Sequence, residues 1–370
     1  MKLAFLEPMP WAYDTVTPLY RPLGGSQSAL CYLAAELVRQ GHEVSILNEV
    51  SEPGLDANGV HILPRAQATS DSALMKRFDV IVVSNLAIGE MLRNALGFRV
   101  PLVLWTGHAP DQGAVESLSR LEEREAWHGY AFVSNWQASA YQRAFSIPSD
   151  KIQVLHNGIA PAFASTPLCE PWFVQGRDPV LAYTSTPFRG LTWLLDAFPA
   201  IREAFPNARL RVFSSMAVYN LPASQDDYGR IYERCDRMDQ VEYVGSVSQS
   251  QLPIEMAQCA GLAYPSVFPE TFCISAAEAL AIGASLLTTR CGALPSLFGE
   301  YGEFIDLSSD LNGFESRYGD LVIESLRKDL AAPELRQKRR QANADAVRQR
   351  FSWPSLARSW IEWLHGLLEN

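Results

Sequence analysis

The chain has 370 residues, 48% of them hydrophobic and 19% charged, which is enough apolar material for folded cores and too little charge for a disordered chain. At about 150 residues per domain, this length predicts two domains. Lys and Arg number 31 against 41 Asp and Glu, so the formal net charge is −10, the opposite of the balance that neutralises phosphates in nucleic-acid binders. We therefore expect no nucleic-acid partner.

Membrane insertion and export are not expected either. The apolar run at 79–83 is strand-sized, well short of the roughly 18 residues of a membrane span. The N-terminal run at 1–6 meets Glu7 and Pro8 at once and is too short for a secretory signal. The six cysteines lack the close spacing of a zinc site or redox pair and are interpreted as reduced thiols. These features favour a cytoplasmic protein with at most peripheral membrane contact.

The first part of the chain alternates short apolar runs with amphipathic stretches. The apolar runs predict strands over residues 2–6, 43–47, 80–84, 102–105 and 131–134. Helical segments lie between them, such as the one over 26–40 that Gly41 closes. Continuous apolar strands separated by helices predict a doubly wound parallel sheet covered on both faces, which is an α/β architecture.

The same alternation restarts in the second part of the chain. Strands are expected over residues 180–184, 210–214, 241–244, 262–265 and 285–288. Proline, small and polar residues without a period predict a linker between the two parts. The predicted boundaries are a first domain over 1–160, the linker over 161–179, a second domain over 180–350, and a C-terminal helix over 351–370 that can cross back to the first domain. The sequence sets no oligomeric state.

Several signatures of nucleotide and hydrolase chemistry are missing from the sequence. There are no three spaced glycines after the first strand, no P-loop, no nucleophile elbow and no zinc-protease motif. There is also no Asp-x-Asp, the carboxylate pair that often holds a divalent ion on a nucleoside diphosphate. If the chain binds a diphosphate, its charge must be balanced without that metal clamp.

A glycine pair opens the first predicted helix. Gly24 and Gly25 let the backbone approach a ligand, and free N–H groups at a helix start favour an anion, although a plain turn with Ser26 as N-cap is the alternative. The preceding loop over 7–25 is far longer than the usual connection of about 2 to 6 residues. It carries rings suited to the apolar faces of a sugar or lipid acceptor: Trp11, Tyr13 and Tyr20.

Two further candidates follow predicted strands. His108 comes directly after the strand ending at Trp105, and the carboxyl ends of such strands face a ligand crevice. Arg189, beside Gly190 at a strand-to-helix turn, can present a forked donor to an anion. The alternatives are a structural histidine and a surface arginine.

The alanine-rich segment at 269–283 contains two acids, Glu270 and Glu278. Helical neighbours of Glu278 are small or apolar, so its carboxylate faces a large desolvation cost unless a ligand supplies donors, as sugar hydroxyls would. Eight residues on a helix span about 12 Å, so we expect Glu270 at the helix start and Glu278 two turns in to contact opposite ends of one elongated ligand. The alternative is an N-terminal acid that complements the helix dipole together with an internally paired Glu278.

Several motifs together resemble the retaining glycosyltransferases of family four, which have the GT-B fold. They are Gly24-Gly25, Gly41-His42-Glu43-Val44, Ser134-Asn135-Trp136, His156-Asn157-Gly158, Arg189-Gly190 and Glu270-x7-Glu278, in the family's order. The resemblance implies two Rossmann-like domains that face a cleft, the first for the acceptor and the second for a UDP- or GDP-linked donor. It also implies metal-independent transfer with retention and no cofactor, to a glycan, lipid-linked or small-molecule acceptor.

The resemblance also implies residue roles. Glu270 and His108 would contact the donor sugar and Glu278 the ribose hydroxyls, while Arg189 would stabilise the leaving diphosphate, whose oxygen would take the acceptor proton. The remaining donor-binding positions that it implies are Gly25, Val244, Thr271, Phe272, Cys273 and Ile274.

The sequence departs from the family's pattern at two places. Thr184 or Ser185 stands where a second cation is expected, and Thr271 and Cys273 replace glycines. Two other functions stay open: a nucleotide-sugar epimerase or hydrolase on the same fold, and a catalytically silent sugar-binding subunit.

Overall fold

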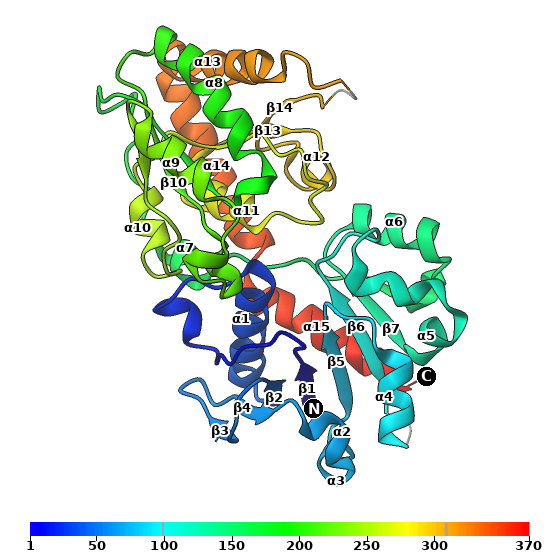
Figure 1. The fold of residues 1–370 in the computed structure, drawn as a ribbon. Coiled ribbons are helices and arrows are strands. Elements are labelled where there is room, and N and C mark those ends of the chain that lie inside the picture. Colours follow the sequence, from blue (N-terminus) through cyan, green and yellow to red (C-terminus); the bar gives the residue numbers. More distant parts are fainter. Residues whose placement is uncertain (98–99, 308–309, 370) are drawn as a thin grey trace. The chain divides into compact units, whose positions relative to one another are not determined.

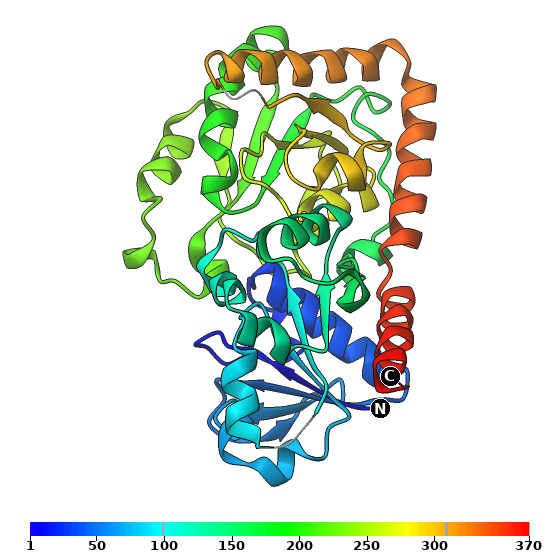
Figure 2. The same ribbon diagram turned by 90° about the vertical axis from the view of Figure 1, so that its right-hand side faces the viewer.

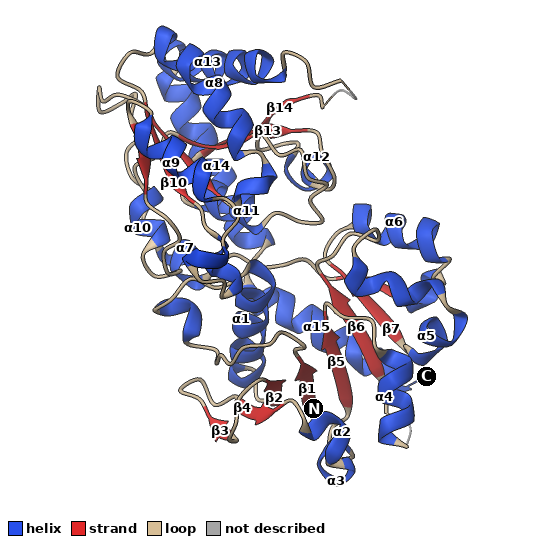
Figure 3. Cartoon of the chain, in the orientation of Figure 1, coloured by secondary structure: helices blue, strands red, loops and turns tan. Residues whose placement is uncertain are grey.

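The computed structural model describes residues 1–97, 100–307 and 310–369, and these form two compact units. The first unit comprises residues 1–17, 25–158 and those from 353 onward, and the second comprises residues 18–24 and 159–352. Each unit has a sheet flanked by helices (Figures 1 and 3). Among the described residues, every helix is too short or too polar to cross a lipid bilayer.

The first unit holds, within the described residues, an eight-stranded sheet in the order β3-β4-β2-β1-β5-β6-β7-β8. All neighbours pair in parallel except β3 with β4. The strands are β1 (Lys2–Leu6), β2 (Glu43–Asn48), β3 (Gly54–Leu55), β4 (His61–Pro64), β5 (Val80–Ser84), β6 (Leu102–Thr106), β7 (Gly129–Phe132) and β8 (Ile152–Val154). The helices are α1 (Gly25–Arg39), α2 (Gln67–Ser70), α3 (Ser72–Met75), α4 (Gly89–Leu96), α5 (Leu121–Ala126), α6 (Asn135–Phe145) and α15 (Trp353–Glu369).

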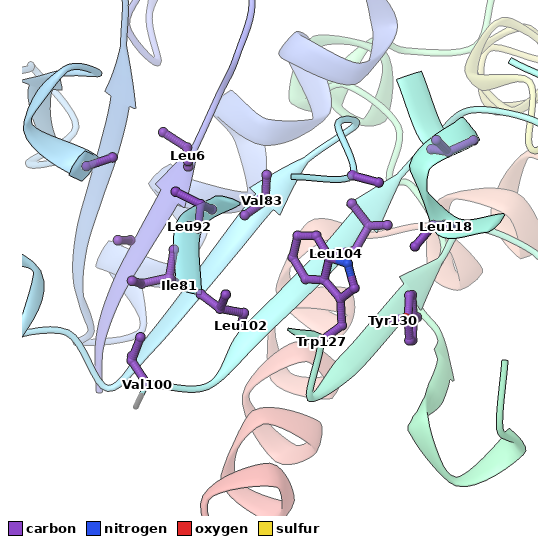
Figure 4. Packing of buried hydrophobic residues seen from close by; sticks show 14 of the residues in the cluster. Leu6, Ile81, Val83, Leu92, Val100, Leu102, Leu104, Leu118, Trp127 and Tyr130 are labelled. Carbon is purple, nitrogen blue, oxygen red and sulfur yellow. The ribbon is translucent and has the colours of Figure 1, made fainter. Parts of the chain in front are cut away.

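A continuous apolar core covers one face of this sheet. Leu104 on β6 lies among side chains from the neighbouring strands, and Trp127 and Tyr130 close the cluster toward β7 (Figure 4). Burying each aromatic side chain removes about 150 to 250 Å² from water, so these rings supply much of the stability of the layer. The core therefore holds the strands of this sheet rigidly, and this fixes the start of each loop that follows the carboxyl end of a strand.

The second unit holds, over the described residues, a six-stranded parallel sheet in the order β11-β10-β9-β12-β13-β14. Its strands are β9 (Val180–Thr184), β10 (Arg209–Phe213), β11 (Val241–Tyr243), β12 (Gly261–Tyr264), β13 (Ser285–Thr289) and β14 (Glu303–Ile305). Its helices are α7 (Pro161–Ser165), α8 (Leu191–Ala204), α9 (Gly229–Arg237), α10 (Leu252–Met256), α11 (Ile274–Ala281), α12 (Leu294–Phe298), α13 (Phe314–Ala331) and α14 (Pro333–Arg350). Figure 2 shows α13 and α14 as consecutive helices that run in different directions.

The highly charged helix α14 is attached to this unit through arginines that bind backbone carbonyls. Arg340 donates from Nη2 to the Ala260 carbonyl at 2.8 Å, and Arg348 donates from Nε to the Ala281 carbonyl at 2.7 Å. Carbonyls at the end of a helix have no intrahelical partner, so the bond to Ala281 caps the last turn of α11. This fixes the end of the helix that carries Glu278.

Two segments differ from their sequence-based expectation. The strand predicted over 131–134 lies at Gly129–Phe132, because Ser134 leaves the strand to cap α6, where its side chain accepts from the Gln137 N–H at 3.1 Å. Residues 161–179, predicted to be a linker, belong to the second unit. Trp172 there is only 6% exposed and donates from Nε1 to Asp329 Oδ2 at 3.2 Å, so an aromatic anchor holds the segment in place.

Candidate active site

Arg189 lies in the tight turn between β9 and α8 of the second unit. A short 3₁₀ turn at Pro187–Arg189 is followed by Gly190, which has φ +120°. An added Cβ at Gly190 would lie 2.2 Å from the carbonyl oxygen of Pro265, which directly follows β12. Only glycine therefore lets this turn approach the end of β12, and that approach brings Arg189 toward Glu270.

The backbone of Glu270 is held by a second close approach. The Ala293 N–H donates to the Glu270 carbonyl at 2.7 Å. Gly292 has φ +61°, and a Cβ on it would lie 2.3 Å from that same carbonyl oxygen. Glu270 is only 4% exposed, so the protein fixes both its main chain and its side chain.

The carboxylate of Glu270 is bonded by two protein donors. Arg189 Nη1 forms an ion pair with Glu270 Oε1, and the Tyr264 hydroxyl donates to the same oxygen. The Arg189 guanidinium also lies over the Phe268 ring, 4.4 Å from its centroid. Burial is the largest single influence and would lower the pKa of Arg189, but the charge and hydrogen bond of Glu270, together with Tyr264 and Tyr219, outweigh it and hold that pKa well above its ordinary value. The pair is thus a buried, charged and preorganised unit.

Glu278 is buried on α11 and has few partners. It is 4% exposed, and within the described part of the chain its side chain has one hydrogen-bond partner, the Ala160 N–H, which donates to Oε1 at 3.3 Å. Burial raises the pKa of Glu278 to about 8, and the bond from Ala160 only partly opposes this. A carboxylate can accept about four hydrogen bonds, so most of its acceptor capacity is left for a ligand.

The distance argument for the two acids is wrong in one respect. Helix α11 begins at Ile274, so Glu270 precedes it in an irregular loop, and the helical rise does not set the separation of the two carboxyl groups. The loop is positioned instead by Gly292 and Arg189, which a helical pattern cannot show.

The residues between the acids form the start of α11. Thr271 and Phe272 are buried, and the Phe272 ring packs edge-on against Phe351 with centroids 5.2 Å apart. Cys273 is the N-cap of the helix and has φ 73°, in the left-handed region that favours glycine. The N–H groups of Ile274, Ser275 and Ala276 belong to the first turn and have no acceptor in the helical ladder, whereas the Ala277 N–H already donates to the Cys273 carbonyl.

The backbone strain at Cys273 leads to a stability prediction. At positive φ a Cβ costs roughly 1 kcal/mol, whereas at ordinary positions glycine is the less stable choice. We therefore expect Cys273→Gly to be more stable than Cys273→Ala by about 1 kcal/mol, the reverse of the usual order. Urea unfolding of both variants measures this difference. An Ala variant as stable as the Gly variant, or more so, would contradict the strain.

Other polar groups end strands of the same sheet. Among the described residues, the side-chain oxygens of Thr186 after β9 and Ser214 after β10 are buried without a hydrogen-bond partner. Val244, which follows β11, donates its N–H to the Val212 carbonyl at 2.9 Å, so a ligand could contact only its carbonyl or side chain. The second cation of the family's pattern has no counterpart here, because Thr184 or Ser185 stands at that position and offers a hydroxyl group instead.

In the first unit, the glycine at the start of α1 and the turn that carries His108 lie side by side. Gly25 begins α1, and a Cβ on Gly107 would lie 3.2 Å from Ser26 Oγ, so the start of α1 abuts the turn after β6. His108 is half-buried in that turn, and its carbonyl accepts from Gln137 Nε2 at 2.7 Å and from the Tyr141 hydroxyl at 3.1 Å. The sequence indicated His108 but not the two side chains of α6 that fix its backbone.

The three loop aromatics do not all belong to one unit. Tyr13 is 4% exposed, and its hydroxyl donates to Glu7 Oε2 at 3.0 Å, so it anchors the loop in the first unit. Trp11, half-buried, belongs to the same unit, whereas Tyr20, 65% exposed, belongs to residues 18–24 of the second unit. Burial also raises the pKa of Glu7 to about 7. Glu7 was not predicted, since the sequence shows only an acid after a strand.

Metal-ligating side chains do not cluster. Over residues 1–97, 100–307 and 310–369, no group of three His, Cys, Asp or Glu side chains could hold a metal ion. The six cysteines are free thiols, and Cys169 alone among them is exposed.

Both halves of the chain match known family models. Residues 23–163 match the model described as Glycosyltransferase Family 4, and residues 179–316 match the model described as Glycosyl transferases group 1. Two curated relatives are an MMP alpha-(1->4)-mannosyltransferase of Mycolicibacterium hassiacum, 27% identical over 61% of this chain and 51% of that protein, and a phosphatidyl-myo-inositol mannosyltransferase of Mycobacterium leprae, 23% identical over 60% and 54%. The matched part thus spans about half the length of these relatives.

Solved structures share the fold at low sequence identity. The sucrose-phosphate synthase of Thermosynechococcus elongatus superposes with a TM-score of 0.70 at 13% identity and full coverage of both chains. The Anabaena protein Alr3699/HepE, in complex with UDP, has a TM-score of 0.71 at 16% identity, with 99% of this chain and 100% of that chain covered. Together with the two family models, these similarities identify the chain as a glycosyltransferase of family 4, group 1, with the GT-B fold.

Proposed function

We propose that the protein transfers a sugar, with retention and without a divalent metal, from a UDP- or GDP-linked donor to a hydroxyl group of a glycan, lipid-linked or small-molecule acceptor. The observation that carries this proposal is Glu278, a buried carboxyl group with a single hydrogen-bond partner among the described residues. Burying such a group costs free energy unless donors are supplied, and the two ribose hydroxyls of a nucleotide are suitable donors. Burial raises the pKa of Glu278 to about 8, and the bond from Ala160 only partly opposes this, which supports a need for further donors to the charged form.

The start of α11 and Arg189 would hold the diphosphate. Helix α11 has eight residues, and its N-terminal N–H groups together with the helix dipole favour an anion. Arg189 uses Nη1 for Glu270, and its other guanidinium N–H groups can serve the phosphates. The donor-binding positions Thr271, Phe272, Cys273 and Ile274 line the approach to this helix start, and Glu270 would contact the donor sugar.

The proposed reaction needs no covalent enzyme intermediate. The bond between the anomeric carbon and the diphosphate oxygen breaks, the acceptor oxygen bonds that carbon on the same face, and the acceptor proton passes to the departing diphosphate oxygen. Negative charge grows on the diphosphate, where Arg189 and the N–H groups of α11 stabilise it. In the first unit, His108 would donate to the donor sugar, with Gly25 near the phosphates and Trp11 toward the acceptor.

The similarity to known proteins supports the donor class. Alr3699/HepE has been solved in complex with UDP and with UDP-glucose, and two curated relatives are mannosyltransferases.

A panel of nucleotide sugars tests the proposed function. We expect one UDP- or GDP-linked sugar to raise the melting temperature, because a ligand that binds the native state stabilises it by mass action. With that donor, nucleoside diphosphate should appear faster when an acceptor is added, and NMR of the product should show the donor's anomeric configuration. Isomerised donor sugar without an acceptor would indicate an epimerase. Binding without turnover on any acceptor would indicate a silent subunit.

Metal independence is a separate prediction. The charge of the leaving group is assigned to Arg189 and the start of α11, so we expect an excess of EDTA to leave the transfer rate unchanged. Readdition of Mg²⁺ or Mn²⁺ should give no gain. A rate that falls with EDTA and returns with Mn²⁺ would contradict this assignment.

A further inference from the structure

Two protein donors converge on one oxygen of Glu270. The Tyr264 hydroxyl and Arg189 Nη1 both bond Oε1, and within the described part of the chain neither they nor any other side chain bonds Oε2. We propose that Tyr264 is a positioning residue that holds the Glu270 carboxylate in one rotamer, with Oε1 bound to the protein and Oε2 directed to the donor sugar. This inference rests on the proposed function and adds a residue that acts on the reaction only through Glu270.

Tyr264 is itself held rigidly at the end of β12. It is 1% exposed, and its carbonyl accepts from Thr288 Oγ1 at 2.7 Å and from the Ser266 N–H at 2.8 Å. Its ring lies 5.9 Å from that of Tyr183. A phenol fixed at its backbone and its ring can present its hydroxyl in only one place, which suits it to orient a neighbour.

The Tyr264 hydroxyl remains a donor over the working pH range. Burial, and next the charge of Glu270, raise the pKa of the Tyr264 phenol well above its ordinary value. The proton therefore stays on the tyrosine, and the bond is one from a neutral donor to a charged acceptor, which is stronger than a bond between neutral groups.

Arg189 alone would not fix the carboxylate. In the proposed reaction the Arg189 guanidinium must also donate to the diphosphate. Its N–H groups are therefore divided between Glu270 and the leaving group as negative charge grows there. The Tyr264 hydroxyl makes one further polar contact among the described residues, to Ser185 Oγ at 3.4 Å, and in the proposed reaction it does not serve the diphosphate, so its bond to Oε1 persists. A carboxylate that swings when Arg189 re-pairs would misplace Oε2, and a displacement of about 1 Å can cost about 100-fold in rate.

The test is a double-mutant cycle with Tyr264→Phe and Glu270→Gln in the full-length chain. Tyr264→Phe removes only the hydroxyl. We expect it to lower kcat about 10- to 100-fold with little change in the donor KM. In the Glu270→Gln background the same substitution should lower kcat no further, because its effect passes through the Glu270 carboxylate.

Tyr130→Phe is the matched control. Tyr130 is also fully buried, in the first unit, and its hydroxyl donates to the Arg124 carbonyl at 3.0 Å. Removing that hydroxyl costs a comparable hydrogen bond without touching Glu270, so kcat per folded molecule should be unchanged. Folded fractions of all variants are measured by urea unfolding, which separates lost stability from lost turnover.

The outcomes separate the two proposals. A Tyr264→Phe enzyme with wild-type kcat, or one whose loss is equally large in the Glu270→Gln background, overturns the positioning role while the transferase function stands. If the wild-type protein binds a donor but transfers the sugar to none of the acceptors tested, the proposed function itself is overturned. The catalytic consequence for Tyr264 is then overturned with it.

Discussion

Arg189→Ala is expected to lower the transfer rate by at least about 100-fold, the largest effect on turnover among the single substitutions considered. In the proposed reaction Arg189 is the cation that stabilises charge on the leaving diphosphate, and it forms the ion pair with Glu270. No second cation stands at Thr184 or Ser185 to take over. Initial rates of nucleoside diphosphate release, with the donor that stabilises the protein, measure the effect.

The control for Arg189 is Arg211→Ala in the same unit. Arg211 also pairs with acids, Glu242 and Glu255, each at 2.8 Å, and lies over a phenylalanine ring, but nothing assigns it to a ligand. It should keep wild-type turnover per folded molecule. Arg189→Lys, which retains the charge but not the fork, should fall between wild type and Arg189→Ala. If the transfer rate of Arg189→Ala is only a few times lower than that of wild type, the proposal that Arg189 stabilises the leaving diphosphate is contradicted.

Glu278→Gln is expected to change stability in a pH-dependent way. Burial raises the pKa of Glu278 from 4.5 to about 8 in the folded state. The stability that this carboxyl contributes is therefore fully present below about pH 4.5 and is lost as the pH rises through about 8. Gln has no proton to lose. As the pH rises between these values, the free energy of unfolding of the variant should therefore increase relative to that of wild type. The gain should reach a few kcal/mol.

Urea unfolding at a series of pH values, without nucleotide, tests this sign. Glu300→Gln is the control, because Glu300 is exposed on the second unit and its substitution should leave the pH profile of wild type unchanged. Parallel profiles for wild type and Glu278→Gln would show that the carboxyl group does not carry the burial cost that the structure assigns to it.

The same variant should bind nucleotide weakly. If ribose hydroxyls complete the hydrogen bonds of the Glu278 carboxylate, binding favours its charged form and lowers its pKa, so nucleotide binding to wild type releases protons near pH 7. Calorimetry in buffers of different ionisation enthalpy would detect this release. Glu278→Gln should show weaker binding and no such proton release.

Much of the fold could be predicted because it depends on local pattern. The runs predicted as strands at Val80–Ser84 and Val180–Thr184 match β5 and β9 residue for residue. A strand that is covered on both faces is apolar along most of its length, so it stands out in the sequence. The C-terminal helix expected over 351–370 lies at Trp353–Glu369, where tryptophan and leucine recur near helical spacing.

The site was harder to predict because its geometry comes from contacts distant in sequence. Glu270 and Glu278 were marked by charge in an apolar context, but the partner of Glu270 at Tyr264 looks like one more apolar position of a buried strand. The close approach of Gly190 to Pro265 and of Gly292 to Glu270 depends on how loops meet, which no periodicity encodes. Glu7, buried beneath the loop that Tyr13 anchors, was missed for the same reason.

A crystal structure with bound UDP or GDP would examine the premise at Glu278 most directly. The account predicts both ribose hydroxyls within hydrogen-bond distance of the Glu278 carboxylate, with phosphate oxygens at the first turn of α11. A nucleotide bound elsewhere, with Glu278 still bonded to the Ala160 N–H alone, would contradict it.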